Sequence, residues 1–200
     1  MKDRNVFINC PFTLDYRDHF RAIVFTVVRC GFTPRCTRER DDGSEVRYEK
    51  ICRIIRECSL GIHDISNTEL NGDPPLPRFN MPFELGLFLG ATKFGGSDLR
   101  RKYTLILDRD DFRYQAFLSD IAGQDVHAHG GNVTTLISTV ATWLRDHGGP
   151  FEVPGGITIA SEFTDFSSTL PALASSHKLQ DAEITFRDYW ALAQAWILAE

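Results

Sequence analysis

Apolar positions along the chain alternate between short continuous runs and stretches with helical spacing. The continuous runs are typical of buried strands and lie at residues 6–8, 32–36, 60–64, 103–107 and, more weakly, 124–128. Amphipathic stretches between them predict a helix that Asp15 caps, a helix that Ser44 opens, and two more over residues 82–94 and 132–147. This alternation predicts an α/β fold with a doubly wound, mainly parallel sheet of four or five strands.

The helix expected over residues 82–94 is apolar nearly all round, so we expect it to be buried. The connection before it, residues 67–80, contains Gly72, Pro74, Pro75 and Pro77 and is longer than an ordinary loop in an α/β unit. Long loops at strand ends tend to carry function. This loop therefore marks the region where we look for a site.

The sequence changes character after the Gly- and Pro-rich residues 148–156. Two further helices are expected at 162–176 and 185–198, and Thr185 can begin the second. Its large apolar residues recur at helical spacing, so they must be buried against the sheet domain or a second copy of the chain. We therefore expect an α/β domain over residues 1–150 and a C-terminal helical extension over residues 151–200, with a homo-oligomer as the alternative use of that extension.

Charge and hydropathy exclude two classes of partner. The 200 residues include 22 basic and 27 acidic side chains, a net charge of −5, without a basic tract that could neutralise many phosphates. A duplex nucleic-acid partner is therefore disfavoured. The apolar runs are far shorter than the roughly 20 residues that span a bilayer, and the first residues do not form a secretory signal. These features predict a soluble, cytoplasmic protein without a membrane partner.

Cysteine and glycine patterns argue against common cofactors. The five cysteines are an odd number in a chain without a secretory signal, so we expect reduced thiols. His127 and His129 form only a weak metal-ligand spacing. The first predicted strand–helix turn lacks the glycine fingerprint of dinucleotide-binding folds, and the sequence has no P-loop motif. The sequence thus predicts neither a bound metal nor a redox cofactor.

Two carboxylates stand at the ends of predicted elements. Asp64 ends the third strand, and Glu84 follows the long loop near the start of the third helix. Ligands of open α/β sheets bind outside the carboxyl ends of the strands, so we expect both side chains to point into one cleft. Two carboxylates in one cleft suggest chemistry at a glycosidic bond.

Three places in the sequence resemble a known superfamily. The segment 6–12 (VFINCPF), the strand end Asp64 and the helix start 81–86 (MPFELG) look like parts of the nucleoside 2-deoxyribosyltransferases and of their relatives, the TIR-type NAD hydrolases. The resemblance covers residues 5 to about 145. It implies a flavodoxin-like sheet and an N-glycosidase that cleaves the base–ribose bond of NAD or a nucleoside monophosphate. NAD would then be a substrate rather than a cofactor.

The resemblance also implies roles for individual residues. Glu84 would act at the anomeric carbon of a ribosyl unit as nucleophile or counter-ion, and Asp64 would lie near the base or the sugar hydroxyls. The residues implied to bind the nucleotide or nucleoside are Asn9, Pro11, Phe12, Tyr16, Arg78 and Asn80. Phe12 and Tyr16 would stack on the base, and the forked guanidinium of Arg78 suits a phosphate.

Both carboxylates also have simpler roles open to them. If Pro82 is the first helical residue, Glu84 falls close to the third position, where the helix dipole favours a carboxylate by about 0.3–1 kcal/mol without catalysis. Asp64 can close an Asx turn after its strand. The alternative function is a catalytically silent TIR-like module that senses a nucleotide or recruits a protein partner.

Overall fold

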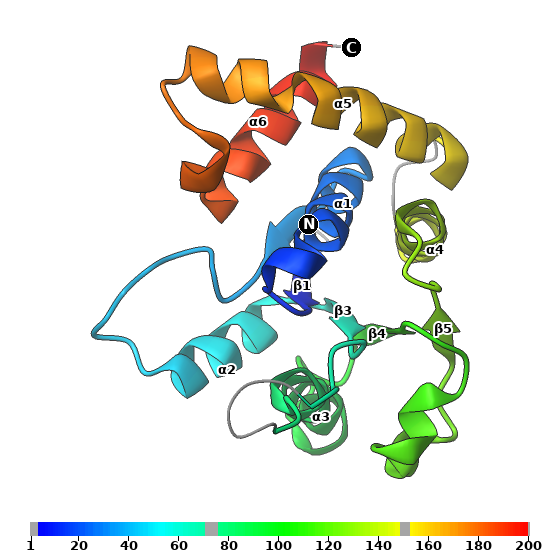
Figure 1. The fold of residues 1–200 in the computed structure, drawn as a ribbon. Helices are drawn as coiled ribbons and strands as arrows, with labels where there is room; N and C mark the ends of the chain where they lie inside the picture. The colour runs from blue at the N-terminus through cyan, green and yellow to red at the C-terminus, as the bar shows by residue number, and fades with distance from the viewer. Residues whose placement is uncertain (1–3, 71–75, 149–152, 200) are drawn as a thin grey trace.

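The computed structural model describes residues 4–70, 76–148 and 153–199 and contains a sheet of five parallel strands (Figure 1). The strands lie in the order β2-β1-β3-β4-β5, with bounds β1 Asn5–Asn9, β2 Thr33–Arg35, β3 Leu60–Asp64, β4 Tyr103–Asp108 and β5 Val126–Ala128. This order is that of a flavodoxin-like doubly wound fold. The predicted fold class and all five predicted strands are confirmed.

Four helices cover the two faces of this sheet. α1 (Arg17–Arg29) and α4 (Val133–Asp146) pack against each other on one face, and α2 (Arg47–Glu57) and α3 (Asn80–Phe94) lie on the other (Figure 1). Every residue of β3 is buried, and so is β1 after its first residue. Strands that are covered on both faces are apolar without alternation, which explains why continuous apolar runs identified them.

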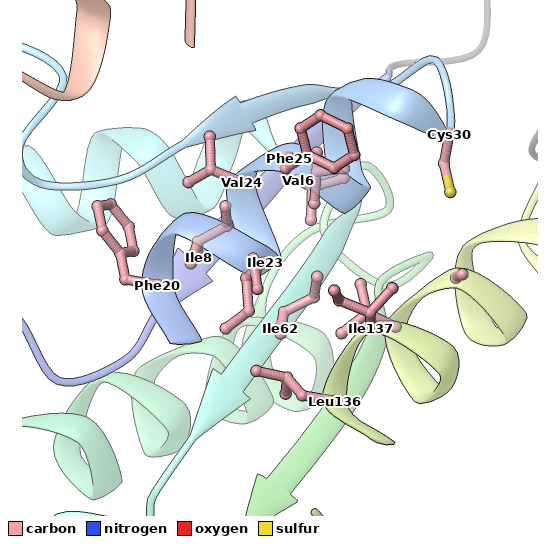
Figure 2. Packing of buried hydrophobic residues seen from close by; sticks show 14 of the residues in the cluster. Val6, Ile8, Phe20, Ile23, Val24, Phe25, Cys30, Ile62, Leu136 and Ile137 are labelled. Carbon is pink, nitrogen blue, oxygen red and sulfur yellow. The ribbon is translucent and has the colours of Figure 1, made fainter. Parts of the chain in front are cut away.

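The main core lies between α1 and the sheet. Figure 2 shows its labelled members, which come from β1, α1, β3 and α4: Val6, Ile8, Phe20, Ile23, Val24, Phe25, Cys30, Ile62, Leu136 and Ile137. Residues 22–27 of α1 are all buried, although they point in every direction around the helix. A helix that is buried all round must be covered on its outer side as well.

The C-terminal helices provide that outer cover. α5 (Gly156–Ser176) and α6 (Phe186–Ala199) form a further layer on α1 and α4, away from the sheet (Figure 1). Phe166 stacks on Phe25 with ring centroids 5.2 Å apart, and Trp196 approaches the same ring at 5.9 Å. The apolar face of the last helix is thus buried within the chain. The expected domain boundary at residues 150 and 151 lies outside the described residues.

Two of the predicted helix starts are wrong. Asp15 lies within a short 3-10 turn, Leu14–Tyr16, and makes no capping hydrogen bond to α1. Ser44 donates its hydroxyl to Asp42 Oδ1 at 2.6 Å, which holds it in a turn, so α2 begins only at Arg47. At Ser44 a local turn competes with the helix for the polar side chain.

α3 also differs from its prediction, because only one side of it is buried. Met81, Leu85 and Phe88 face inward, whereas Phe83 is 53% and Phe94 is 92% exposed. The helix packs mainly against β3, β1 and α2, which cover one of its faces.

Across the described residues, no helix is both long and apolar enough to cross a membrane.

The packing of α5 on α1 predicts a large stability loss for Phe166→Ala. The Phe166 side chain is fully buried, so its removal should lower the free energy of unfolding by about 3–5 kcal/mol. Leu198→Ala is the matched control, because Leu198 is 80% exposed and its truncation should change stability by less than about 0.5 kcal/mol. Urea unfolding followed by circular dichroism measures both. Equal midpoints for the two variants would contradict this packing.

Candidate functional site

The carboxyl ends of β1 and β3 form the topological switch point of the sheet. These strands are neighbours in register, with Asn9 opposite His63. The chain leaves β1 towards β2 through α1 on one face, and it returns to β3 through α2 on the other. Ligands of such sheets bind where the connections diverge. Asp64 and the residues after Asn9 therefore lie at the edge where a site is expected.

Asn9 connects three elements at this edge. Its buried amide Nδ2 donates to His63 Nδ1 at 3.0 Å and to the Met81 carbonyl at 2.9 Å. Both donor hydrogens are thus used within the protein, so Asn9 holds the start of α3 against β1 and β3. The Nδ2 hydrogens of Asn9 are therefore not available to a substrate, and the substrate-binding role implied for Asn9 stays a prediction.

His63 is a neutral core residue. Its ring lies edge-on to Phe7 and Phe88 at centroid distances of 5.6 and 4.9 Å. Nε2 is buried and has no hydrogen-bond partner among the described residues. Burial lowers the pKa of His63 to about 3. Because Nδ1 accepts from Asn9, Nε2 carries the proton of the neutral ring.

Asp64 is fully buried and engaged through both carboxylate oxygens. Oδ1 accepts from the Ser66 backbone N–H at 2.9 Å, which is the Asx turn anticipated as the simpler role. Oδ2 accepts from the Tyr16 hydroxyl at 2.5 Å and lies 3.2 Å from His129 Nε2. Burial raises the pKa of Asp64, but hydrogen bonds from His129, Ser66 and Tyr16 outweigh it and hold the pKa below its ordinary value. Asp64, Tyr16, Ser66 and His129 form what we call the Asp64 cluster.

The Asp64 cluster is not a Ser-His-Asp triad. The Gly131 N–H donates to His129 Nδ1 at 3.1 Å, so Nδ1 bears no proton and Nε2 bears the proton of the neutral ring. Ser66 Oγ lies 3.0 Å from that same Nε2, which also faces Asp64. In a triad the serine and the carboxylate bind opposite ring nitrogens. His129 therefore has no nitrogen left to relay a proton from Ser66 to Asp64.

A small cavity of about 150 Å³ opens beside the Asp64 cluster. Its lining residues are Asp15, Tyr16, His19, Ser66, Asn67, Glu69, Arg109, His129 and Gly131. Pockets for drug-sized ligands occupy roughly 300–1,000 Å³. The cavity is thus too small for a whole nucleotide.

Glu84 lies in a different environment from Asp64. It is the fifth residue of α3, since that helix begins at Asn80 rather than at Pro82, and the helix start has no side-chain capping bond. The capping role considered for Glu84 is therefore wrong. The residue is 6% exposed, and its nearest cation is Arg47, with Nη2 4.0 Å from Oε1. Burial raises the pKa of Glu84 to about 7, against the lowering effect of Arg47.

The buried thiol of Cys10 responds to the charges of both carboxylates. Burial raises the pKa of its thiol well above the ordinary value, and the charges of Asp64 and Glu84 raise it further. The same thiol also responds to the positive charge of Arg38. The charges of both Asp64 and Glu84 therefore act on the thiol of Cys10. At its raised pKa this thiol is protonated and unreactive.

Two arginines that follow β2 lie beside Glu84 and Phe12. The Arg38 guanidinium stands 4.8 Å above the half-buried Phe12 ring, whose other edge packs on Phe20 at 5.1 Å. Arg47 reaches both Glu84 and, at 3.4 Å, the hydroxyl of Thr37. We call Glu84, Arg47, Arg38 and Phe12 the Glu84 site.

The other implied ligand residues are placed less centrally. Arg78 and Asn80 are exposed at the end of the loop and the start of α3, whereas Pro11 is buried. Tyr16 is buried, and its hydroxyl is bound to Asp64. Its ring stacks on His19 at a centroid distance of 4.9 Å. The described residues contain no group of three side chains suited to hold a metal ion.

Sequence reasoning missed His129, Arg38 and Arg47. His129 directly follows β5, and that position at the carboxyl edge was the available signal for it. Arg38 lies in the polar connection after β2 and Arg47 is the first residue of α2, and only the fold brings them to the site. Comparisons with protein-family models, with curated proteins and with solved structures found no match to this chain.

The raised pKa of Glu84 predicts that Glu84→Gln stabilises the protein at alkaline pH. A carboxyl whose folded-state pKa lies above its unfolded value contributes stability below the unfolded pKa, and this stability is lost as pH rises through the folded pKa of about 7. The glutamine variant carries no charge to bury. It should therefore gain about 2–3 kcal/mol relative to wild type on going from pH 4 to pH 8. Urea unfolding at both pH values measures this gain, and an unchanged difference would contradict the raised pKa.

Proposed function

We propose that this protein is an N-glycosidase that cleaves the base–ribose bond of a nucleotide, either NAD or a nucleoside monophosphate, through Glu84. The observation that carries the proposal is a carboxylate that is buried at the switch point, does not cap its helix and has a pKa near neutrality. Such a group is costly for stability and common at catalytic sites. The partner of the protein would be this small-molecule substrate.

The chemistry suits a carboxylate in this position. When the bond between the anomeric carbon and the base nitrogen breaks, its electron pair leaves with the base, and positive charge develops on the ribosyl ring. Ionised Glu84 would stabilise that charge or trap it as a glycosyl ester, which water then hydrolyses. The nicotinamide of NAD leaves as a neutral base and needs no proton, whereas the base of a nucleoside monophosphate leaves as an anion and takes a proton from water. The proposal requires no metal or cofactor.

Arg38 and Arg47 favour a substrate that carries phosphate. The Arg38 guanidinium, from the connection after β2, lies near Phe12, and the Arg47 guanidinium, from the first residue of α2, lies near Glu84. Arg38 has no carboxylate within ion-pair distance among the described residues, and it donates a hydrogen bond to the Phe12 carbonyl at 3.4 Å. Arg38 and Arg78 are both exposed, but the contacts of Arg38 with Phe12 make it the better-placed phosphate ligand. Phe12 offers an aromatic surface beside it.

The alternative is a catalytically silent module that binds a nucleotide. The observation in its favour is the full engagement of Asp64, whose two oxygens are both hydrogen-bonded within the protein. Asp64 is also fully buried, so its carboxylate is not exposed to a sugar hydroxyl. Turnover measurements separate the two functions, since a silent module binds the nucleotide without releasing a base.

Incubation with NAD and a panel of nucleoside monophosphates should release free base, detected by chromatography. Glu84→Gln should reduce the rate by at least about 10³-fold, because losing a reacting carboxylate removes several kcal/mol of transition-state stabilisation. Glu49→Gln is the matched control, since Glu49 is exposed on α2 and should leave the rate unchanged. Unchanged turnover in a folded Glu84→Gln protein would refute the assignment.

Arg38→Met should raise KM for a phosphorylated substrate by about 10–100-fold, because charge-assisted hydrogen bonds contribute roughly 1.5–3 kcal/mol. The corresponding nucleoside without phosphate should show little change. Arg78→Met makes the same chemical change at an exposed position and should leave KM as it is. Steady-state kinetics with both substrates provide the measurement. A larger effect at Arg78 than at Arg38 would return the phosphate role to the loop.

A further inference from the structure

The amino-terminal edge of the sheet contains a cavity of about 790 Å³, far larger than the one beside the Asp64 cluster. Four of its lining residues lie just before or at the start of four strands: Arg4 before β1, Phe32 before β2, Ser59 before β3 and Tyr103 at the start of β4. The other lining residues are Leu60, Arg101, Arg145, Asp146, His147 and Gly148. The strands place this cavity roughly 15 Å from the Glu84 site, at the opposite end of the sheet.

Three arginines give the cavity an excess of positive charge. Arg4, Arg101 and Arg145 line it together with a single acid, Asp146. Within the described part of the chain, none of these arginines has a carboxylate oxygen within 4.0 Å. In a protein with a net charge of −5, such a group concentrates anions locally.

Helix ends explain only part of this arrangement. Arg4 donates to the Gly31 carbonyl at 2.8 Å beyond the end of α1, and Arg145 lies in the last turn of α4, both favourable positions for a cation. Arg101 precedes a strand, however, and has no such helix end to explain it. Favourable positions at helix ends also do not explain why the three arginines line a common cavity.

An aromatic surface adjoins the arginines. Tyr103 is 54% exposed, and its ring packs on His147 with centroids 4.6 Å apart. His147 Nδ1 donates to the Trp143 carbonyl at 2.8 Å, which orients the ring. Nε2 is then left as a hydrogen-bond acceptor for a ligand. An exposed aromatic ring that packs against a second ring is a surface on which a planar base can stack.

We infer that the amino-edge cavity is a second site, specific for a nucleoside polyphosphate, in which Arg101 and Arg145 bind the phosphates and Tyr103 stacks on the base. Its volume lies within the roughly 300–1,000 Å³ typical of small-molecule sites. The guanidinium groups match phosphate geometry, and the tyrosine adds selectivity for a base over a bare phosphate. This site is independent of the glycosidase proposal, because it shares no residue with the Glu84 site.

Isothermal titration with ATP, pyrophosphate and adenosine tests the inference on the full chain. ATP should bind wild type, and its Kd should rise at least 10-fold in Arg101→Met and in Arg145→Met. Arg187→Met is the matched control, since Arg187 is exposed on α6 and should leave the Kd unchanged. Tyr103→Leu should weaken ATP more than pyrophosphate. Circular dichroism checks that each variant is folded.

Two further arms separate this site from the Glu84 site. ATP binding at the amino edge should persist in Glu84→Gln and Arg38→Met. It should weaken as the salt concentration rises from about 0.05 to about 0.5 M. Failure of ATP to bind, or equal affinity in the arginine variants and wild type, would overturn the inference. Loss of binding in Arg38→Met would assign the nucleotide to the other edge. Equal affinity for pyrophosphate and ATP would overturn the role of Tyr103.

Discussion

The parallel pairing of β1 with β3 is the constraint on which the rest of the structure depends. It places Asn9 opposite His63, and from there the Asn9 amide reaches both His63 and the first turn of α3. These hydrogen bonds fix where α3 begins, and the start of α3 fixes where Glu84 stands. Because both strands are buried on two faces, α1 must cover one side of the pair, and α5 and α6 must then cover α1. A slip of this pairing would displace the core and the site together.

The same pairing explains which features could be predicted from the sequence. Central parallel strands appear in a sequence as continuous apolar runs, so the sheet and its class were predictable from short segments such as 60–64. Helix starts were less predictable. The Ser44 hydroxyl, for example, donates to the Asp42 carboxylate in a turn and does not cap the start of α2. The exposure of Phe83 was also not predictable, since it depends on which neighbours pack against α3 and not on the composition of α3.

The candidate site was predictable only where a residue ends a strand or begins a helix. Asp64 and Glu84 met that condition, and Cys10 does sense both charges. Their environments were not predictable. Asp64 is held by His129, which follows the edge strand β5, and Arg47 reaches Glu84 from the start of α2. Tertiary contacts decide that one carboxylate stays ionised within hydrogen bonds and that the other has a pKa near 7.

The direction of the helices separates charge between the two edges of the sheet. In a parallel α/β sheet the helices point their amino ends towards the carboxyl edge, where their dipoles favour anions, and their carboxyl ends towards the amino edge, where cations are favoured. Asp64 and Asp108 lie at the first edge, and Arg4 and Arg145 lie at the second. Arg113 compensates Asp108 directly through a 2.9 Å bond from Nε to Oδ1. A phosphate bound at the carboxyl edge would therefore need a cation that is not already paired with an acidic residue of that edge. Arg38, which comes from the connection after β2, meets that requirement.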